Sequence, residues 1–125
     1  MDLNRDETAS GPIVTGFSGR GFRIRETVFP GGLLLTPLSA MPWEAVPDVA
    51  GLVPGALGDL LVLDPAPEFL LLGTGAGLVQ PPRAFVRALE AMGIGVDAMD
   101  SRAAARAWGV LRAEQRWIAA ALMPL

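Results

Sequence analysis

An apolar run that ends in alternating glycines limits the folds open to this chain. Residues 69–72 read Phe-Leu-Leu-Leu, and residues 73–77 read Gly-Thr-Gly-Ala-Gly. A helical pattern follows over 82–92, and a second apolar run spans 94–99. A strand, a turn, a helix and a second strand in this order predict a crossover between parallel strands. The pattern therefore predicts an α/β protein built around this unit.

A hairpin and further strands are predicted outside this unit. Apolar residues and arginines alternate over 22–25 after a glycine-rich link, which predicts a hairpin with 13–17. Val28 and Phe29 are expected to continue its second strand. Continuous apolar runs predict buried strands over 33–36, 60–63 and 116–123.

Two amphipathic helices are predicted to pack on the sheet. Apolar residues recur at i, i+4 and i+7 over 82–92 and again over 102–113. Asp100 and Ser101 form a suitable N-cap for the second helix. The residues on the two apolar faces are Phe85, Leu89, Met92, Ala104, Trp108 and Leu111.

The residue types that the chain lacks exclude most kinds of catalysis. The 125 residues contain no Cys, His, Lys or Tyr, and all ten basic residues are arginines. Disulfides, Cys/His zinc sites, thiol catalysis, a Ser-His-Asp triad and a lysine Schiff base are therefore excluded within the chain. We expect no catalytic residue, cofactor or metal site. These absences favour a non-enzymatic role over an enzymatic one and leave a weak enzyme as the alternative.

Charge and hydropathy also restrict the partners and the location. A net charge of -3 argues against non-specific binding to nucleic-acid phosphates. No apolar run approaches the roughly 18 residues of a membrane span. Residues 1–11 are polar and lack the pattern of a signal peptide. We therefore expect a flexible tail over 1–11, a single domain over 12–125 and a cytoplasmic location.

The glycine turn is open to three interpretations. A strand precedes it and Asp97 and Asp100 follow the next one, which suits a dinucleotide-binding fingerprint. Its spacing is G-x-G-x-G instead of G-x-G-x-x-G, and the helix begins only near Pro81 or Pro82. The second interpretation is a small anion or ligand held by free backbone N–H groups of the turn, in a shallow crevice that faces the helix beginning near Pro81. The third is a tight turn that lets helix and sheet pack closely.

Other side chains are candidates for binding. The proposed ligand-binding residues are Gly73, Thr74, Gly75, Arg106, Glu114 and Arg116. We also expect Glu114 to be held in a structural role by hydrogen bonds or by an arginine, such as Arg106 or Arg116. Arg20, Arg23 and Arg25 form either a basic face for an anionic ligand or a solvated outer face of the hairpin. Trp43 is a candidate for partner binding, with a lid over the core of its own domain as the alternative.

Several separate stretches together resemble a known family of small domains. The similarity extends from Ile13 to Leu122. The matching residues are Gly16-Phe17, Gly21-Phe22-Arg23-Ile24, Trp43, Leu71-Leu72-Gly73-Thr74-Gly75, Ala103-Ala104, Val110-Leu111, Glu114, Arg116 and Ala119-Ala120-Ala121-Leu122. On these residues the chain resembles the Mth-type domain family of unknown function. Members of that family include a mitochondrial respiratory complex I assembly factor and the adipogenesis-associated Mth-domain protein.

The chain departs from the family pattern at two places. The family usually reads Thr-Tyr-Asn where this chain has Ala107, Trp108 and Gly109, and usually Gly where it has Gln115. A role that depends on asparagine at position 109 is therefore absent. An aromatic residue is kept at Trp108, which favours packing over chemistry.

The resemblance implies a fold and one of two functions. The implied fold is a three-layer α/β unit with a central mixed sheet, helices packed on it and an additional β-hairpin layer. Its last strand is expected to run antiparallel to its neighbours. The implied function is a non-enzymatic interaction or assembly protein with an unidentified protein partner, and a bacterial member could assist assembly of a respiratory complex. The alternative is a small-molecule or anion-binding module that uses the glycine turn and nearby arginines. Whether the chain forms a homo-oligomer is left open.

Overall fold

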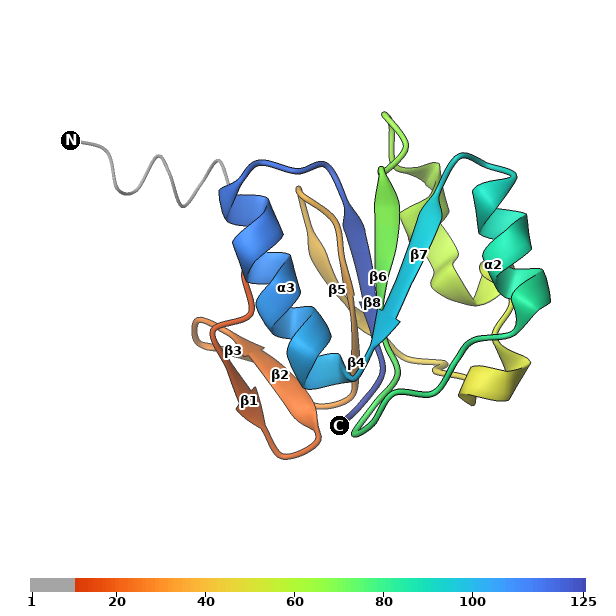
Figure 1. The fold of residues 1–125 in the computed structure, drawn as a ribbon. Helices are drawn as coiled ribbons and strands as arrows, with labels where there is room; N and C mark the ends of the chain where they lie inside the picture. Colours follow the sequence, from red (N-terminus) through yellow and green to blue (C-terminus); the bar gives the residue numbers. More distant parts are fainter. Residues whose placement is uncertain (1–10) are drawn as a thin grey trace.

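The computed structural model describes residues 11–125 and has a five-stranded mixed sheet at its centre (Figure 1). Its order is β5-β4-β8-β6-β7, and a separate antiparallel sheet has the order β1-β2-β3. The strands are β1 (Gly16–Ser18), β2 (Gly21–Ile24), β3 (Thr27–Phe29), β4 (Gly32–Leu35), β5 (Ala40–Trp43), β6 (Phe69–Gly73), β7 (Gly95–Met99) and β8 (Ala119–Leu122). The flexible tail predicted for 1–11 lies, apart from Gly11, outside the described residues and stays a prediction.

The direction of the last strand differs between its two neighbours. β8 is antiparallel to β4 but parallel to β6, which is also parallel to β7. The expectation that β8 runs antiparallel to both neighbours is therefore wrong. The reason is that a helix returns the chain from the carboxyl end of β7 to the opposite end of the sheet, so β8 starts beside the start of β6.

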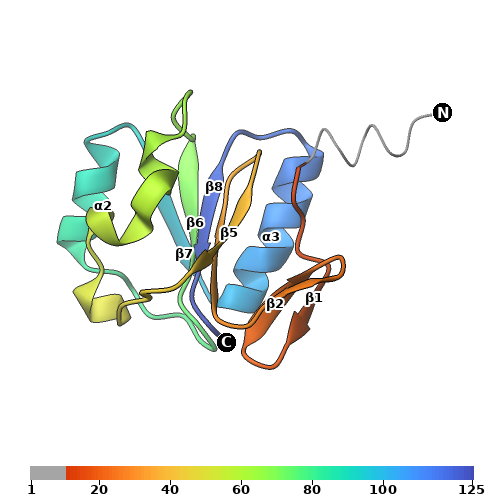
Figure 2. The ribbon, with the colours of Figure 1, turned by 180° about the vertical axis from the view of Figure 1, so that it is seen from behind.

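Helices and the small sheet cover the two faces of the central sheet. Figure 1 and Figure 2 show α3 (Ser101–Ala113) and the sheet β1-β2-β3 on one face, and α2 (Arg83–Glu90) with the 3-10 segments on the other. Buried residues alternate accordingly, because successive side chains of a strand point to opposite faces. Leu70 and Leu72 pack with α2, whereas Leu71 packs with α3. The expected three-layer α/β architecture with a hairpin layer is confirmed.

The hairpin has one strand more than predicted. β1 and β2 pair antiparallel around the turn at Gly19, as expected. Arg25 has a φ of 55°, and the chain reverses there. Val28 and Phe29 consequently form β3, antiparallel to β2, instead of continuing β2.

The segment 60–63 is helical, so the strand predicted there is wrong. It belongs largely to η2 (Pro54–Val62), a 3-10 segment kinked at Gly58 that follows η1 (Val49–Gly51). Leu60 is fully buried, whereas Val62 is 74% exposed. Residues two apart would share one face of a strand. A four-residue apolar run is too short to distinguish the two structures by periodicity.

Both predicted helices are present. In α2, Phe85 and Leu89 are buried, but Met92 lies beyond the helix end and is 46% exposed. Gly93 follows with a φ of +82°, the left-handed conformation in which helices commonly end. At the start of α3, Asp100 accepts a hydrogen bond from the Ala103 N–H at 2.9 Å, which confirms the N-cap.

Candidate functional site

The glycine turn lies at the carboxyl end of β6, as predicted, but its first N–H groups are already bonded. The Thr74 N–H donates to the Met99 carbonyl at 2.9 Å. The Gly75 N–H donates to the Ser101 Oγ, also at 2.9 Å. The prediction that these two N–H groups are free to hold an anion is therefore wrong, because acceptors at the end of β7 and the start of α3 already bind them.

Close packing explains the glycines of this turn. Ser101 is fully buried, and its Oγ also donates to the Met123 carbonyl at 2.7 Å. A Cβ at Gly73 would lie 2.7 Å from that same Oγ. Gly75 has a φ of +100°, which favours glycine. The turn therefore joins β6, α3 and the end of β8 at one crowded point, in line with the packing interpretation.

Thr74 fixes the loop that follows the turn. Its Oγ1 donates to the Gly77 carbonyl at 2.7 Å and accepts from the Val79 N–H at 3.0 Å. The loop carries two large apolar side chains at the surface, since Leu78 is 54% exposed and Val79 is 51% exposed. An anchored backbone thus presents an apolar pair to solvent.

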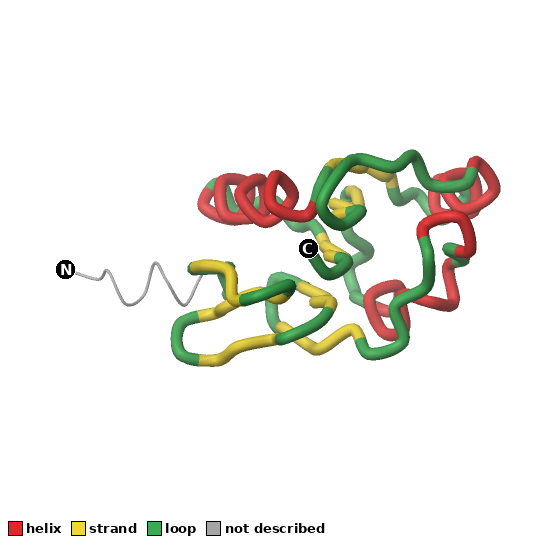
Figure 3. Tube along the Cα trace, turned by 90° about the horizontal axis from the view of Figure 1, so that it is seen from below, coloured by secondary structure: helices red, strands yellow, loops and turns green. Residues whose placement is uncertain are grey.

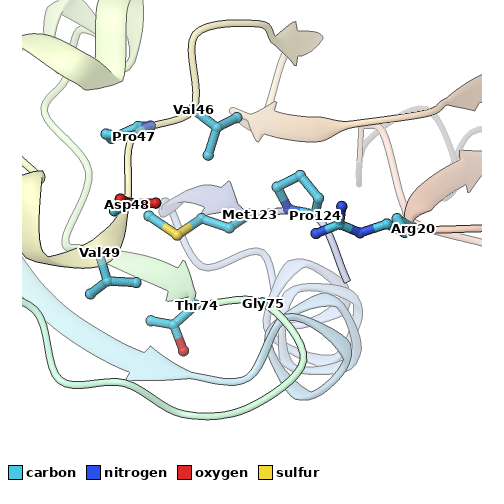
Figure 4. Close-up of a pocket in the computed structure, with 9 residues that line it drawn as sticks. All are labelled: Arg20, Val46, Pro47, Asp48, Val49, Thr74, Gly75, Met123 and Pro124. Atoms are coloured by element: carbon cyan, nitrogen blue, oxygen red, sulfur yellow. The ribbon is translucent and has the colours of Figure 1, made fainter.

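A cavity of about 300 Å³ opens beside the turn. It faces the segment 46–49 and the end of the chain, not the start of α2 as we expected. Figure 3 views the molecule from this end, with the C-terminus near the centre. The lining residues, drawn in Figure 4, are Arg20, Val46, Pro47, Asp48, Val49, Thr74, Gly75, Met123 and Pro124.

The two charged residues of this cavity come from different elements. Arg20 lies in the turn between β1 and β2, where its Nε donates to the main-chain oxygen of Leu125, the last residue of the structure, at 2.8 Å. The Leu125 N–H in turn donates to the Arg20 carbonyl at 2.8 Å. Asp48 precedes η1. Sequence reasoning grouped Arg20 with the hairpin arginines and did not consider Asp48, because no local pattern connects them.

The remaining predicted ligand residues do not gather at the turn. α3 begins beside Gly75 and carries the chain away from it. Arg106, along that helix, lines a separate cavity of about 210 Å³ between α3 and the β1 region. Glu114 and Arg116 follow the far end of α3. The structure therefore separates Gly73, Thr74 and Gly75 from all three side chains that were grouped with them.

Arg116 pairs with a different carboxylate from the one expected. Its Nη2 lies 2.9 Å from the Glu68 Oε1, and its Nε donates to the Glu68 Oε2 at 3.2 Å. The hydrogen bond from Arg116 lowers the pKa of the Glu68 carboxyl below its usual value. The same hydrogen bond raises the pKa of Arg116, and Glu114 adds only a smaller Coulombic contribution. Glu114 itself is exposed, and Arg116 forms its ion pair with Glu68, so the structural role of Glu114 stays a prediction.

A buried arginine was not considered as a site residue. Arg112 is only 4% exposed, and its Nη1 donates to the Arg116 carbonyl at 2.5 Å. Desolvation lowers the pKa of the guanidinium, which still remains charged. This hydrogen bond links the last turn of α3 to the segment that leads into β8. No sequence pattern distinguishes this arginine from the exposed ones on the same helix.

Trp43 lies in the core. The residue is 4% exposed, and its Nε1 donates to the Ala56 carbonyl at 2.9 Å, which ties β5 to η2. This geometry supports the lid interpretation, since little of the indole is accessible to a partner.

Residues 11–125 contain neither a candidate metal site nor a helix that could span a membrane. In that part of the chain, no group of three or more His, Cys, Asp or Glu side chains is arranged to hold a metal ion. No helix there is both long and apolar enough to span a bilayer.

Sequence comparison relates the chain to proteins of bacteria and animals. It is 35% identical over 112 residues to an uncharacterized protein of Rhodobacter capsulatus, covering 90% of this chain and 84% of that protein. It is 28% identical over 124 residues to the Danio rerio protein named NADH dehydrogenase (ubiquinone) 1 alpha subcomplex assembly factor 3, covering 99% of this chain and 71% of that protein. The Drosophila melanogaster protein of the same name is 31% identical, over 94% of this chain and 61% of its own length.

Solved structures share the fold. A crystal structure of a Bordetella parapertussis protein superposes with a TM-score of 0.81 at 34% identity, covering 91% of this chain and 96% of the other. A solution structure from Bordetella pertussis, described as a Mth938-like domain, has a TM-score of 0.79 at 29% identity, over 99% and 92% of the two chains. The model of a family described as protein of unknown function (DUF498/DUF598) matches residues 14–123. The chain therefore belongs to the DUF498/DUF598 family and has the Mth938-like fold.

Proposed function

We propose that this protein is a non-enzymatic assembly factor that binds a subunit of a respiratory NADH dehydrogenase complex. The observation that carries the proposal is the similarity to two animal complex I assembly factors, which extends over nearly the whole chain. The similarity is not confined to one motif, since it covers 99% and 94% of this chain.

The chemistry of the chain favours binding over catalysis. Without His, Cys, Lys or Tyr, the side chains that remain as general bases or nucleophiles are those of Asp, Glu, Ser and Thr.

The anchored loop after β6 is our candidate for the contact with the partner. Leu78 and Val79 are both more than half exposed, and the Thr74 hydroxyl holds the loop in place. Apolar side chains on a fixed backbone bind at a lower entropic cost than the same side chains on a mobile segment. Exposed apolar groups of this kind are typical of protein contacts.

The test is affinity capture of the tagged protein, cross-linked in the cells from which it comes. We expect subunits of the NADH dehydrogenase complex among the captured proteins. The double substitution Leu78→Ser with Val79→Ser should reduce their recovery at least about tenfold, because interface anchors contribute on this scale. Fractionation of the same cells would check a cytoplasmic location, which is part of the proposal.

Val110→Ser is the matched control. Val110 is 61% exposed on α3, away from the loop, so its loss removes surface apolarity without touching the proposed contact. Capture without any NADH dehydrogenase subunit would contradict the assembly role. Equal loss of recovery with both variants would contradict the assignment to the loop.

A further inference from the structure

β7 forms an open edge of the central sheet. The two sheets end in four edge strands, β1, β3, β5 and β7. β1 and β3 have three residues each, and β5 contains Pro42, which has no backbone N–H to donate. β7 has five residues and no proline. Figure 1 shows it at the near edge of the sheet, between α3 and α2, with no helix or strand drawn in front of it.

The two ends of β7 bond inward, towards β6. The Gly95 N–H donates to the Glu68 carbonyl at 3.3 Å. The Met99 carbonyl accepts from the Thr74 N–H at 2.9 Å. Both bonds lie on the β6 side of the strand, and they set the alternation of the residues between them.

The backbone groups of Val96 and Ala98 point outward. In a parallel pair, alternate residues of a strand bond to the same neighbour, so Asp97 bonds towards β6 whereas Val96 and Ala98 face the open side. Within residues 11–125, no group pairs with the N–H and C=O of these two residues. An edge strand with such a row of groups is a template for pairing with another strand.

The apolar cluster on the α2 face is open at this edge. The side chains of Val96 and Ala98 belong to the margin of that cluster and are half-buried. Their neighbours in β6, Leu70 and Leu72, are buried. A strand added beside β7 would continue the cluster, so apolar side chains next to Val96 and Ala98 would gain burial.

The α3 face of β7 carries a charge and a residue without a side chain. Met99 packs into the cluster on that face, so Asp97 and Gly95 lie on the same face. The Asp97 carboxylate is exposed and makes no ion pair with any residue of 11–125. A Cβ at Gly95 would meet only the Phe69 Cβ, at 3.4 Å. An added strand therefore fits with a basic residue opposite Asp97 and an aromatic residue opposite Gly95.

Asp97 also disfavours a second copy of this chain at the same edge. Antiparallel pairing of two β7 strands through all of their outward groups places Val96 of one copy opposite Ala98 of the other. The two Asp97 residues then face each other with their Cα atoms about 4.5 Å apart, the spacing of a non-hydrogen-bonded pair. Like charges directly opposite destabilise a strand pair. The edge therefore selects a basic strand over a second copy.

We infer that the open edge of β7 binds an extended segment of a partner protein as an added strand. The segment carries a basic residue opposite Asp97 and apolar residues beside Val96 and Ala98. Backbone hydrogen bonds supply affinity in this mode of recognition, and the alternating side chains supply specificity. The inference does not depend on the proposed assembly role or on the loop after β6, because synthetic peptides test it.

The probe is the peptide acetyl-Thr-Phe-Val-Arg-Val-Phe-Thr-amide. Its sequence reads the same in both directions, so parallel and antiparallel addition both place Arg opposite Asp97 and Val beside Val96 and Ala98. Two control peptides differ from it at single kinds of position. One has Glu in place of Arg, and the other has Pro in place of both Val residues, which removes backbone donors and prevents strand pairing.

NMR of the ¹⁵N-labelled full chain measures binding and exchange of the amide hydrogens with water. We expect saturable shifts along β7 with the Arg peptide. At saturation the Val96 and Ala98 amides should exchange at least about tenfold more slowly, because exchange then requires a hydrogen bond to open. The Asp97 amide, already bonded to β6, should change little. The Glu peptide should bind at least about fivefold more weakly and the Pro peptide not measurably.

A charge reversal assigns the basic position. Asp97→Arg should bind the Glu peptide more tightly than the Arg peptide, by at least about fivefold. Glu44→Arg is the matched control, since Glu44 is an exposed acid directly after β5, at the opposite edge of the sheet. This variant should keep the preference for the Arg peptide within about twofold of the unaltered protein.

Four results would overturn the inference. The first is the absence of saturable shifts up to about 5 mM Arg peptide. The second is binding that leaves exchange at Val96 and Ala98 unchanged, since the peptide would then lie elsewhere. The third is equal affinity for the Glu or the Pro peptide. The fourth is slow exchange at Val96 and Ala98 without peptide that depends on protein concentration, which would place a second copy at this edge. The peptide series uses the unaltered protein, so it decides the question even if Asp97→Arg fails to fold.

Discussion

At the scale of single residues, the Ser101 side chain links two separate parts of the central sheet. Its buried hydroxyl accepts the Gly75 N–H and donates to the Met123 carbonyl, so it joins the turn after β6 to the end of β8. The hydroxyl also stands where a side chain at Gly73 would be. One small polar residue thus accounts for two features that the sequence presents as unrelated, the glycine turn and the start of α3.

Substitution of Ser101 by Ala should destabilise the protein by about 1–3 kcal/mol, because a buried N–H and a buried carbonyl lose their partner. Urea denaturation would measure the free energy of unfolding. Ser18→Ala, at the half-buried end of β1, is the control and should change it by less than about 0.5 kcal/mol. A loss for Ser101→Ala no larger than that of the control would show that the two groups find other partners.

At the scale of elements, α2 packs through one narrow stripe. Phe85 and Leu89 are buried, while Arg83, Arg87 and Glu90 are exposed. The helix is short, and isolated helices of this length are unstable in water. Its stability therefore depends on how completely those two side chains are buried against the sheet.

Leu89→Ala should cost about 2–5 kcal/mol, the usual range for a fully buried leucine. Met92→Ala, just beyond the helix end, is the matched control and should cost less than about 0.5 kcal/mol because the residue is 46% exposed. Chemical denaturation of both variants would measure the difference. Similar losses for the two would mean that the buried stripe is wrongly assigned.

At the scale of the whole molecule, one sheet separates two apolar clusters. Trp43 belongs to the cluster on the α2 face, and Trp108 belongs to the cluster on the α3 face. β6 and β8, which are adjacent in the sheet, each contribute side chains to both clusters. Loss of the sheet would therefore expose both clusters together.

Both clusters should unfold in one cooperative transition. Incorporation of 5-fluorotryptophan would label Trp43, Trp108 and Trp117, and ¹⁹F NMR would follow each native signal in urea. We expect all three native signals to disappear at the same urea concentration. Earlier loss of the Trp108 signal alone would mean that α3 and the hairpin layer detach before the rest.

Local patterns in the sequence determined most of the elements. The hairpin around Gly19, the N-cap at Asp100 and the strand before the glycine turn were all predicted correctly. Each is encoded within a few neighbouring residues, by side-chain period or by turn chemistry. The prediction of a strand over 60–63 was wrong because four consecutive apolar residues show neither a strand period nor a helix period.

The tertiary structure alone decided which groups of the candidate site meet. The Ser101 Oγ and the Met99 carbonyl accept hydrogen bonds from the N–H groups that were expected to bind an anion. Arg116, which was expected to hold Glu114, pairs with Glu68. Arg20 and Asp48 reached one cavity although no local pattern relates them. Hydrogen bonds and ion pairs depend on distances in space, and a side chain's partner can lie anywhere along the chain. The sequence by itself therefore determined most of the elements and the kinds of chemistry excluded, whereas the fold determined which polar groups are paired and which line a cavity.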